Sequence, residues 1–336
     1  MVKGEPVVEI LIPASRLTRV TAQSLANVLA DSPRGIARIV VFLDAEIKDS
    51  ETERIQFLFA DSVEFIESGG TQRGPAWARN ELARLAHAPF IVFADSDVLI
   101  PPQFVSRILP LLSDAPKGSV IAPRIEPLYP TRSMSRFFSR FILSPSVVDG
   151  RVVAPTTTLA LSRTTWLASE PFDERFQAPG GEDWDWMIRN NRKTSGFSVR
   201  YVPQLSVQHD DPRSIWGVLR RAWKYGSQER LIYTLVDDDM SVSNPALRES
   251  LGTHSKMSSW LSLLSGPEYW DQFKIVLWKD YVLTRPFEFV WHSWRFLPPQ
   301  WVEGAYHLVV LQVFAAVARL SRLFHHFGAS GRRDEH

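Results

Sequence analysis

The chain has 336 residues, and its 38 basic and 37 acidic side chains leave a net charge of +1. This balance gives no general attraction to nucleic acid, so we expect no nucleic-acid partner. Cysteine is absent, which excludes disulfides, thiolate zinc sites and cysteine nucleophiles. The N-terminal residues lack the long apolar core of a secretion signal, and we therefore expect a cytoplasmic protein of one large domain or two smaller ones.

The first half of the chain alternates strand-like and helix-like patterns. Short apolar runs predict buried strands, whereas apolar residues at helical spacing predict amphipathic helices. The predicted strands are Val7–Ile12, Ile36–Leu43, Val63–Ile66 and Phe90–Ala94. The predicted helices are Leu17–Ala30, one that begins at Pro75 and one that begins at Pro101. This order indicates an α/β fold with a mostly parallel, Rossmann-like sheet flanked by helices, whose ligands bind at the carboxyl ends of the strands.

The pattern is less regular after Ser119. Further strands are predicted at Val120–Ala122, Thr156–Leu161, Ser198–Val202 and Leu205–Gln208. Helices are predicted at Glu182–Asn191 and Ile215–Leu231. On the second of these helices we expect three apolar side chains to pack inward, namely Trp216, Leu219 and Trp223.

The last hundred residues form an aromatic-rich extension that we expect to be α-helical. Six tryptophans lie between residues 260 and 301, and Ala305–Leu320 is strongly apolar. Polar side chains interrupt that stretch, so it falls short of the roughly 20 apolar residues needed to span a bilayer. Residues 255–336 therefore suit a peripheral contact with the inner face of the cell membrane. A packed helical subdomain or a homo-oligomer contact explains the same pattern equally well.

Two aspartates, in the segment Asp95-Ser96-Asp97, come directly after the predicted strand Phe90–Ala94. Acidic residues at a strand end are common in turns and helix caps, so the pattern has a purely structural explanation. In extended backbone, however, residues two apart point the same way, and a pair of carboxylates can hold Mg²⁺ or Mn²⁺. Phosphate oxygens usually fill the open positions of such an ion, which makes a nucleoside diphosphate the expected ligand.

Three acidic residues open the helix predicted from Glu182, directly after Gly180 and Gly181. Acids in a first helical turn stabilise the free N–H groups and the helix dipole, which is a sufficient explanation by itself. The functional alternative is that the glycines let a ligand approach the backbone while Asp183 acts as a general base on a hydroxyl. His209 ends a strand-like segment, and either a structural role or a place in a mixed oxygen and nitrogen metal site explains it.

Read in chain order, these segments resemble the inverting, metal-dependent glycosyltransferases of family 2, which have the GT-A fold. Each segment alone is common, but their order and spacing together are specific. The resemblance covers roughly residues 7 to 230. The matching segments are Leu11-Ile12-Pro13, Asp44, Arg73–Asn80, Phe93–Asp97, Phe172–Phe176, Gly181–Asp185 and His209.

The resemblance implies a nucleotide site built from two groups of residues. The first group matches positions that line the base and ribose: Pro13, Ala14 and Asp44. The second group matches the segment that runs past the donor and the helix that supports its pocket: Gly74, Arg79 and Asn80.

The resemblance also implies metal ligands and catalytic residues. The metal ligands implied are Asp95, Asp97 and His209. Ser96 lies between the two acids, on the nucleotide side of this motif. Asp183 matches the catalytic base, and Glu182 is expected to face the acceptor or to support that base.

The implied activity is an inverting, hexosyltransferase-type reaction that requires Mn²⁺ or Mg²⁺. A sugar moves from a nucleoside-diphosphate sugar to a hydroxyl of a glycan, lipid-linked or other acceptor. The implied catalytic domain covers residues 1–235, with a nucleotide-sugar-binding half at 1–118 and an acceptor-binding half at 119–235. Residues 236–336 form the helical C-terminal region.

Two other functions remain open at this stage. A sugar-phosphate nucleotidyltransferase can use a similar nucleotide-binding sheet, but it releases pyrophosphate and leaves Glu182 and Asp183 without a clear role. A non-catalytic sugar-nucleotide-binding scaffold would bind the nucleotide and assemble partners through the aromatic C-terminal region.

Overall fold

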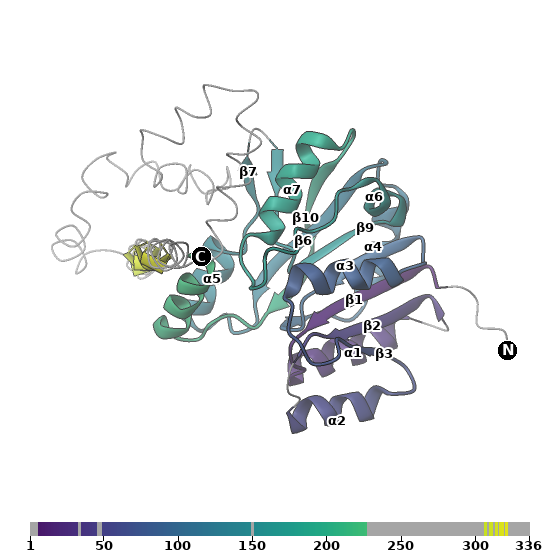
Figure 1. Ribbon diagram of the computed structural model, residues 1–336, viewed down its shortest axis with the longest axis horizontal. Helices are drawn as coiled ribbons and strands as arrows, with labels where there is room; N and C mark the ends of the chain where they lie inside the picture. The colour runs from purple at the N-terminus through teal and green to yellow at the C-terminus, as the bar shows by residue number, and fades with distance from the viewer. Residues whose placement is uncertain are drawn as a thin grey trace, which may run out of the picture. The chain divides into compact units, whose positions relative to one another are not determined.

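The computed structural model describes residues 6–32, 35–45, 49–148 and 151–226, together with helical residues within 306–321 (Figure 1). The chain divides into two compact units, one made of Met1–Pro130 with Leu143–Asp211 and the other of Thr131–Ile142 with Pro212–His336. The predicted domain boundary at residue 235 and most of the predicted C-terminal extension lie outside the described residues.

The first unit is built on a sheet with the strand order β3-β2-β1-β4-β9-β6-β10-β5. The first four strands are mutually parallel and correspond to the strands predicted in the first half of the chain. Their bounds are β3 Glu64–Glu67, β2 Ala37–Leu43, β1 Val8–Ala14 and β4 Phe90–Ala94.

The other half of the sheet is mixed. Its strands are β9 Thr158–Ser162, β6 Ser119–Pro127, β10 Ser198–His209 and the short β5 Val98–Leu99. β9 is antiparallel to both β4 and β6, β10 is parallel to β6, and β5 is antiparallel to β10. Because β4 and β6 are both antiparallel to β9, they run in the same direction as each other. The strands β4, β6 and β10 therefore all end at the same edge of the sheet. Four of the seven pairings are parallel, which agrees with the mostly parallel sheet expected from the sequence.

Helices pack on both faces of this sheet (Figure 1). Thr18 begins α1 with a capping box, and Pro75 occupies the first turn of α3, where a missing N–H group costs no hydrogen bond. The helices of the first unit are α1 Arg19–Asp31, α2 Ser50–Phe59, α3 Pro75–Leu85, α4 Phe104–Ser113, α6 Arg163–Ala168 and α7 Glu182–Lys193. A separate hairpin joins β7 Ser146–Val148 to β8 Arg151–Val153.

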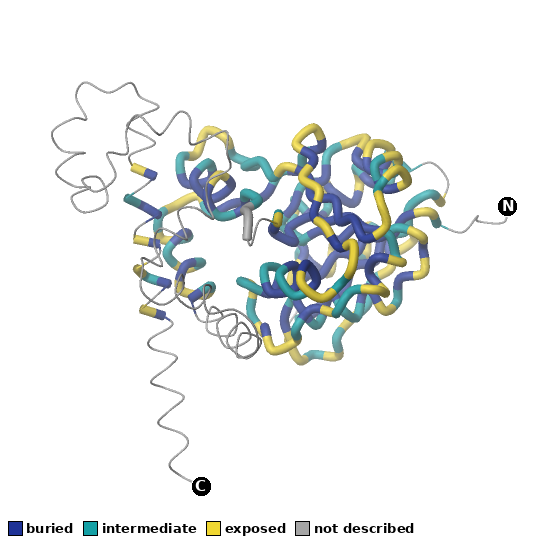
Figure 2. The backbone as a smooth tube through the Cα atoms, turned by 90° about the horizontal axis from the view of Figure 1, so that it is seen from above, coloured by how far each residue is buried: buried dark blue, intermediate teal, exposed yellow. Residues whose placement is uncertain are grey.

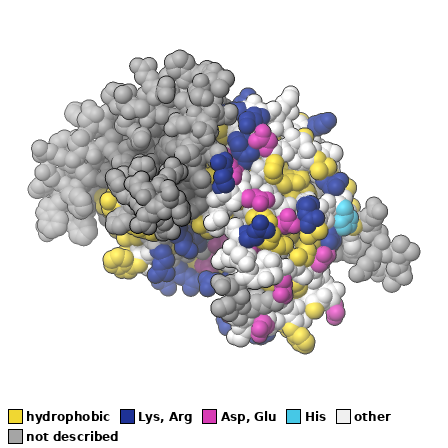
Figure 3. Space-filling view, in the orientation of Figure 1, with side chains coloured by type: hydrophobic (Ala, Val, Ile, Leu, Met, Phe, Trp, Pro, Cys, Tyr) yellow, Lys and Arg dark blue, Asp and Glu magenta, His cyan; other side chains and the backbone are white. Residues whose placement is uncertain are grey.

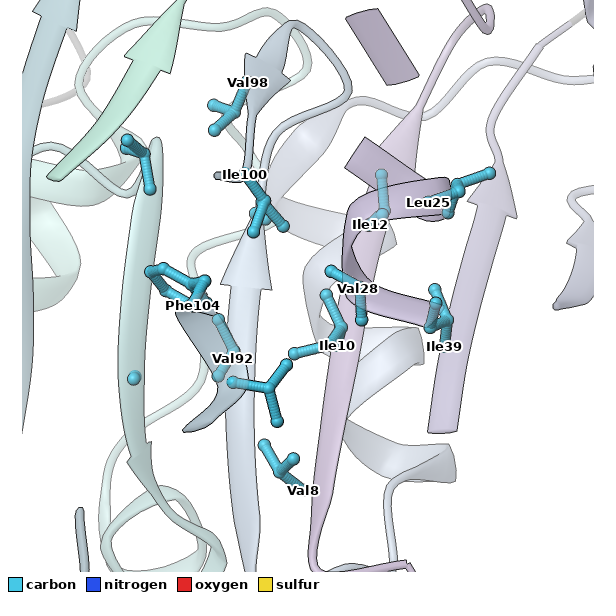
Figure 4. Packing of buried hydrophobic residues seen from close by; sticks show 14 of the residues in the cluster. Val8, Ile10, Ile12, Leu25, Val28, Ile39, Val92, Val98, Ile100 and Phe104 are labelled. Carbon is cyan, nitrogen blue, oxygen red and sulfur yellow. The ribbon is translucent and has the colours of Figure 1, made fainter. Parts of the chain in front are cut away.

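The main core lies between the parallel strands and the helices α1 and α4. Ile10 and Val92 from the strands meet Leu25 from α1 and Phe104 from α4, and all four side chains are buried (Figure 4). The burial of the central strands is visible along the backbone in Figure 2. Burying this continuous apolar surface is the main favourable contribution to the stability of the unit.

An aromatic cluster fills the opposite face of the sheet. Phe93 follows Val92 in β4 and therefore points to the other side. Its ring lies 5.5 Å from Trp166 of α6 and 6.0 Å from Phe172, and Phe172 stacks on Trp186 of α7 at 4.9 Å between ring centroids. These ring contacts fix α7 and the loop before it against the sheet.

The strand segments predicted at Ser198–Val202 and Leu205–Gln208 form one strand, β10. Its pairing with β6 shifts register between Val202 and Ser206, around Pro203, which has no N–H group to donate to a sheet. The sequence signal was split because this irregularity interrupts the alternation of apolar and polar residues.

The second unit is helical in its described part. It contains α5 (Ser133–Phe141), residues 215–226 and helical residues within 306–321. The inward packing predicted for two tryptophans is wrong, because Trp216 is 74% exposed and Trp223 is 40% exposed. Val218 and Ala222 form the buried face of that helix instead. Among the described helices, none is both long and apolar enough to cross a membrane.

Candidate active site

The candidate site lies at the edge of the first unit's sheet where β1, β2, β4 and β10 end. Asp44 follows β2, Asp95 follows β4, and His209 is the last residue of β10. Thr157, just before β9, comes to the same edge because β9 runs in the opposite direction. The topology thus brings together acidic and imidazole side chains that are far apart in the sequence.

The acidic segment 95–97 runs along this edge from β4 to β5. The Asp95 N–H group donates to the Thr157 carbonyl at 3.0 Å, and the Asp97 carbonyl accepts from the Asp210 N–H group at 2.9 Å. The Thr21 hydroxyl of α1 donates to the Ser96 carbonyl at 2.7 Å. The backbone of the segment is therefore held by three different parts of the first unit.

Helix α1 also fixes the residues that follow this segment. Ser24 donates to the Val98 carbonyl at 2.6 Å and accepts from the Ile100 N–H group at 3.0 Å. Asn27 donates to the Ile100 carbonyl at 2.8 Å. Thr21, Ser24 and Asn27 lie three residues apart on one helix face, so a polar stripe of α1 adds to the pairing of β5 with β10.

Arg79 joins the acidic segment to the start of α7. Its guanidinium donates to Asp95 at 2.7 Å and to Glu182 at 3.0 Å, and its side chain is 3% exposed. Burial lowers the pKa of Arg79, but the charges of Asp95 and Glu182 outweigh this effect and raise the pKa above its ordinary value. Partial burial raises the pKa of Asp95 to about 6, although Arg79 acts in the opposite direction.

The three acids of α7 have different environments. Glu182 is bound to Arg79 and also accepts from the Gly180 N–H group at 2.8 Å. Asp185 forms an ion pair with Arg189 at 2.7 Å. Asp183 forms no ion pair within the described residues and accepts only backbone N–H groups, from Trp184 at 2.8 Å and Thr156 at 3.3 Å. Within the described residues, Asp183 is therefore the one of the three acids that is not bound to a cationic side chain.

Burial and the neighbouring Glu182 charge raise the pKa of Asp183 to about 7. A carboxyl group with this pKa is about half deprotonated at neutral pH, and it binds a proton more firmly than an ordinary carboxylate, as a general base requires.

His209 lies between two carboxylates. Its Nε2 atom is 3.3 Å from Asp97, and its Nδ1 atom is 2.7 Å from Asp211, whose side chain is fully buried. Burial lowers the pKa of His209, but Asp97 and Asp211 together raise it to about 10. In this state the ring is an imidazolium that bridges the two acids.

The carboxylate oxygens of Asp97 and the ring nitrogen of His209 are atoms that can coordinate a divalent cation. A carboxylate oxygen and an imidazole nitrogen are ligands that Mn²⁺ accepts, and a carboxylate behind the imidazole is the usual way in which proteins orient such a ligand. The described residues nevertheless contain no group of three or more acidic and histidine side chains arranged around one point. Asp95, the third predicted ligand, is bound to Arg79.

The residues predicted to contact the nucleotide hold neighbouring loops in place. Asp44 accepts from the N–H groups of Arg73 at 3.0 Å and Gly74 at 2.7 Å, and its own N–H group donates to the Ala14 carbonyl at 2.8 Å. Pro13 and Ala14 are the buried end of β1. These bonds bring the ends of β1 and β2 and the loop before α3 into one rigid corner.

Gly74 and Asn80 bring α3 against the loop that precedes α7. Gly74 has a φ of +100°, and a Cβ atom there would lie 2.5 Å from the Gln177 carbonyl oxygen, so only glycine fits. The Asn80 amide accepts from the Phe172 N–H group at 3.0 Å and donates to its carbonyl at 2.9 Å. Both residues therefore set the distance between the two sides of the site.

Sequence reasoning gave no role to Asp211 and no partners to Arg79. Asp211 could have been found, because an acid two residues after a candidate histidine ligand is close enough to bind its second ring nitrogen. The Arg79 pairings could not, since Glu182 is 103 residues away in the chain.

Part of the chain matches a known protein family. The model of the family described as glycosyl transferase family 2 matches residues 10–167. A search of curated protein sequences found no match.

Three solved structures illustrate the structural likeness. A mannosyltransferase from Pyrobaculum calidifontis in complex with GDP-Man and Mn²⁺ has a TM-score of 0.55 and 15% identity, over 94% of this chain and 88% of that chain. GalNAc-T7 with UDP, GalNAc and Mn²⁺ has a TM-score of 0.45 and 16% identity, over 62% of this chain and 43% of that chain. TarS from S. aureus has a TM-score of 0.45 and 12% identity, over 94% of this chain and 54% of that chain. This chain thus spans about half the length of the last two.

We expect Arg79→Met to lower the free energy of unfolding by about 3–5 kcal/mol, because it leaves two carboxylates without their buried cation. Urea denaturation followed by circular dichroism measures this loss. Arg84→Met is the matched control, since Arg84 pairs with Glu81 on the surface of the same helix. Equal midpoints for the two variants would show that the Arg79 ion pairs do not stabilise the fold.

Proposed function

Because the chain belongs, through residues 10–167, to glycosyl transferase family 2 and has the GT-A fold, we propose that it transfers a sugar from a nucleoside-diphosphate sugar to an acceptor hydroxyl with inversion. One observation carries the proposal. The buried Arg79 side chain binds both Asp95, beside the candidate metal ligands, and Glu182, beside the candidate base. This arrangement supports a proposed donor side and a proposed acceptor side at the same sheet edge.

The candidate metal ligands are Asp97 and His209, with Asp95 next to them and Asp211 behind the imidazole. When bound there, Mn²⁺ or Mg²⁺ neutralises the negative charge that develops on the terminal phosphate of the leaving nucleoside diphosphate. Asp211 would keep the proton on Nδ1, and a bound cation would replace the proton on Nε2, between the imidazole and the Asp97 carboxylate. The Mn²⁺ in the mannosyltransferase with a TM-score of 0.55 supports the choice of cation.

Asp183 is the general base of the proposed reaction. It takes the proton of the acceptor hydroxyl while that oxygen bonds to the anomeric carbon and the bond from this carbon to the phosphate oxygen breaks. Attack from the face opposite the leaving group inverts the configuration, and no covalent enzyme intermediate is needed. The half-buried position of Asp183 and its freedom from ion pairs within the described residues support this role.

Glu182 supports the base through Arg79. Its carboxylate stays bound to the guanidinium and to the Gly180 N–H group, so its charge is fixed next to Asp183 and keeps the proton affinity of that residue high. Glu182 is therefore a positioning residue in this proposal.

The nucleotide lies, in this proposal, along the corner formed by the ends of β1 and β2 and the loop before α3. Asp44 and Gly74 shape this corner, Asn80 holds α3 against the loop before α7, and the half-buried Ser96 contacts the diphosphate in this proposal. We propose a glycan or lipid-linked acceptor and a cytoplasmic location, with peripheral contact at the inner face of the membrane and a homo-oligomer as further proposals.

We expect Asp183→Asn to lower the rate of nucleoside diphosphate release by about 10²–10⁴-fold, because the acceptor proton loses its base. Donor-induced thermal stabilisation with Mn²⁺ should persist in this variant, whereas Asp97→Asn should lose it. Screening UDP-, GDP- and dTDP-sugars supplies the donor.

Glu53→Gln is the control for these variants, since it changes an exposed acid of α2, outside the proposed transfer machinery. Retained transfer in Asp183→Asn would refute the assignment of the base. Release of pyrophosphate from a nucleoside triphosphate would instead identify a nucleotidyltransferase.

The pH dependence follows from the pKa of Asp183 of about 7. The base must be deprotonated, so kcat/KM should be constant above this pKa and fall about tenfold per pH unit below it. Initial rates with saturating Mn²⁺ between about pH 5.5 and 9 measure the profile. A profile that is flat down to the lowest pH would mean that the base has an ordinary carboxyl pKa or is another group.

Asp211→Asn tests the support behind His209. We expect Mn²⁺ affinity to fall by about 10–100-fold, because the imidazole loses the carboxylate that orients it. Electron paramagnetic resonance of free Mn²⁺ measures the affinity without any turnover. Asp210→Asn is the matched control, and equal affinities in the two variants would remove Asp211 from the site.

A further inference from the structure

Arg73 lies in the corner where the proposed function places the nucleotide. Its N–H group donates to both carboxylate oxygens of Asp44, at 3.0 and 3.1 Å, so its backbone is held at the end of β2. The side chain of Arg73 is exposed. Figure 3 shows dark-blue basic side chains next to yellow hydrophobic ones over the region where Figure 1 draws α3, the helix that follows Arg73 in the chain.

An aromatic stack fixes the side chain of Arg73. Its guanidinium carbon lies 4.4 Å from the centroid of the Trp77 ring, in the first turn of α3. The Trp77 ring packs edge-on against Phe42 of β2, at 5.2 Å between centroids, and Phe42 is buried. A guanidinium held over an indole gains a cation–π contact and loses less conformational freedom when it binds a ligand. The stack therefore holds an oriented cation at the sheet edge.

Asp44 is too enclosed to recognise a nucleotide base in this corner. It is 4% exposed, and its carboxylate oxygens accept the N–H groups of Arg73 and Gly74. The neighbouring Ala14 is buried, and its carbonyl accepts the Asp44 N–H group. Arg16 is exposed in the loop after β1, but in the part of the chain that the structure describes it lies over no aromatic ring. Arg73 is therefore the oriented polar group of the corner.

The guanidinium of Arg73 is available to a ligand. The described residues place no carboxylate within ion-pair distance of it, whereas Arg79 and Arg84 of α3 each pair with an acid. A guanidinium carries only donors, and its planar fork of N–H groups fits two acceptors that lie side by side. An acceptor pair on the ligand is thus the expected partner of Arg73.

The strand order indicates which end of the nucleotide meets Arg73. β1 lies between β2 and β4, so strand spacing alone places the ends of β2 and β4 about 10 Å apart. The proposed function places the diphosphate beside Asp97, which follows β4, and His209, which ends β10. Arg73, at the end of β2, is therefore on the side where the base of the nucleotide lies.

The bases differ in the acceptors that they offer to such a fork. Guanine presents two adjacent acceptors, O6 and N7, and arginine binds this pair with two parallel hydrogen bonds. Adenine and cytosine carry an amino donor in place of the carbonyl oxygen. Uracil has an N–H donor between its two carbonyl oxygens. Guanine is therefore the base that matches a side chain with donors alone.

We propose that Arg73 binds O6 and N7 of a guanine base, so that the sugar donor of this protein is a GDP-sugar. The assignment rests on the proposed function and adds the identity of the base to it. In this assignment Trp77 is a positioning residue, because it holds the guanidinium, and Asp44 positions the backbone of Arg73.

Calorimetric titration of the full chain with nucleoside diphosphates and Mn²⁺ tests the assignment. We expect GDP to bind more tightly than UDP or ADP. Inosine diphosphate shares O6 and N7 with GDP and should also bind more tightly than ADP, whereas 7-deaza-GDP lacks the N7 acceptor and should bind more weakly than GDP. Arg73→Lys keeps the charge but removes the fork, and it should lower the ratio of GDP to UDP affinity by about 5–150-fold.

Arg84→Lys is the matched control, because Arg84 lies on the same helix and pairs with Glu81 at the surface, and it should leave this ratio unchanged. An equal loss of GDP and UDP affinity in Arg73→Lys would show that Arg73 contacts the phosphates or the ribose, and would overturn the assignment. So would UDP or ADP that binds as tightly as GDP, although the proposed function would then stand. Failure of every nucleoside diphosphate to bind would overturn both.

Discussion

A single buried guanidinium ties the two sides of the candidate site together. Arg79 comes from α3, and its two carboxylate partners come from the end of β4 and the start of α7. A buried cation with two acids is stable only while both pairs stay formed, so the positions of the three elements are mutually dependent. The Phe172 ring, 5.6 Å from the same guanidinium, extends this dependence to the aromatic cluster beneath α7. The acids are thereby in place before any ligand binds, which is the condition for electrostatic preorganisation.

The neighbouring acids are distinguished by what they bind. Glu182 and Asp185 each neutralise an arginine, whereas Asp183 accepts only backbone N–H groups within the described residues. At the other end of the site, Asp211 fixes an imidazole and Asp97 faces it. In both places an acid with a structural contact stands next to one for which we propose a chemical role. Acids that lie close together in the chain therefore differ because they bind different partners, and residue type alone does not reveal this difference.

The sequence predicted the parallel half of the sheet well, because Phe90–Ala94 and the other buried strands are continuous apolar runs bounded by polar residues. It missed α2, since Phe57 and Leu58 lie exposed on that helix and the expected apolar periodicity is absent. The acidic residues could be named as candidates from their positions after a strand and after two glycines. Their partners could not, because the Arg79 contacts depend on tertiary packing. The exposure of the tryptophans could not be predicted either. Helical spacing shows which side chains share a face, but it does not show which face packs against the rest of the protein.

The irregularity in β10 has a consequence for how this stretch of chain can vary. Side chains alternate between the two faces of a strand, and the alternation that buries Leu205, Val207 and His209 restarts after the register shift at Val202. The number of residues between Val202 and His209, odd or even, therefore decides which face of the sheet the imidazole points to. Insertion or deletion of one residue here would turn His209 to the wrong side of the sheet, whereas changes by two would preserve it. Changes in chain length between Val202 and His209 are thus confined to even numbers of residues.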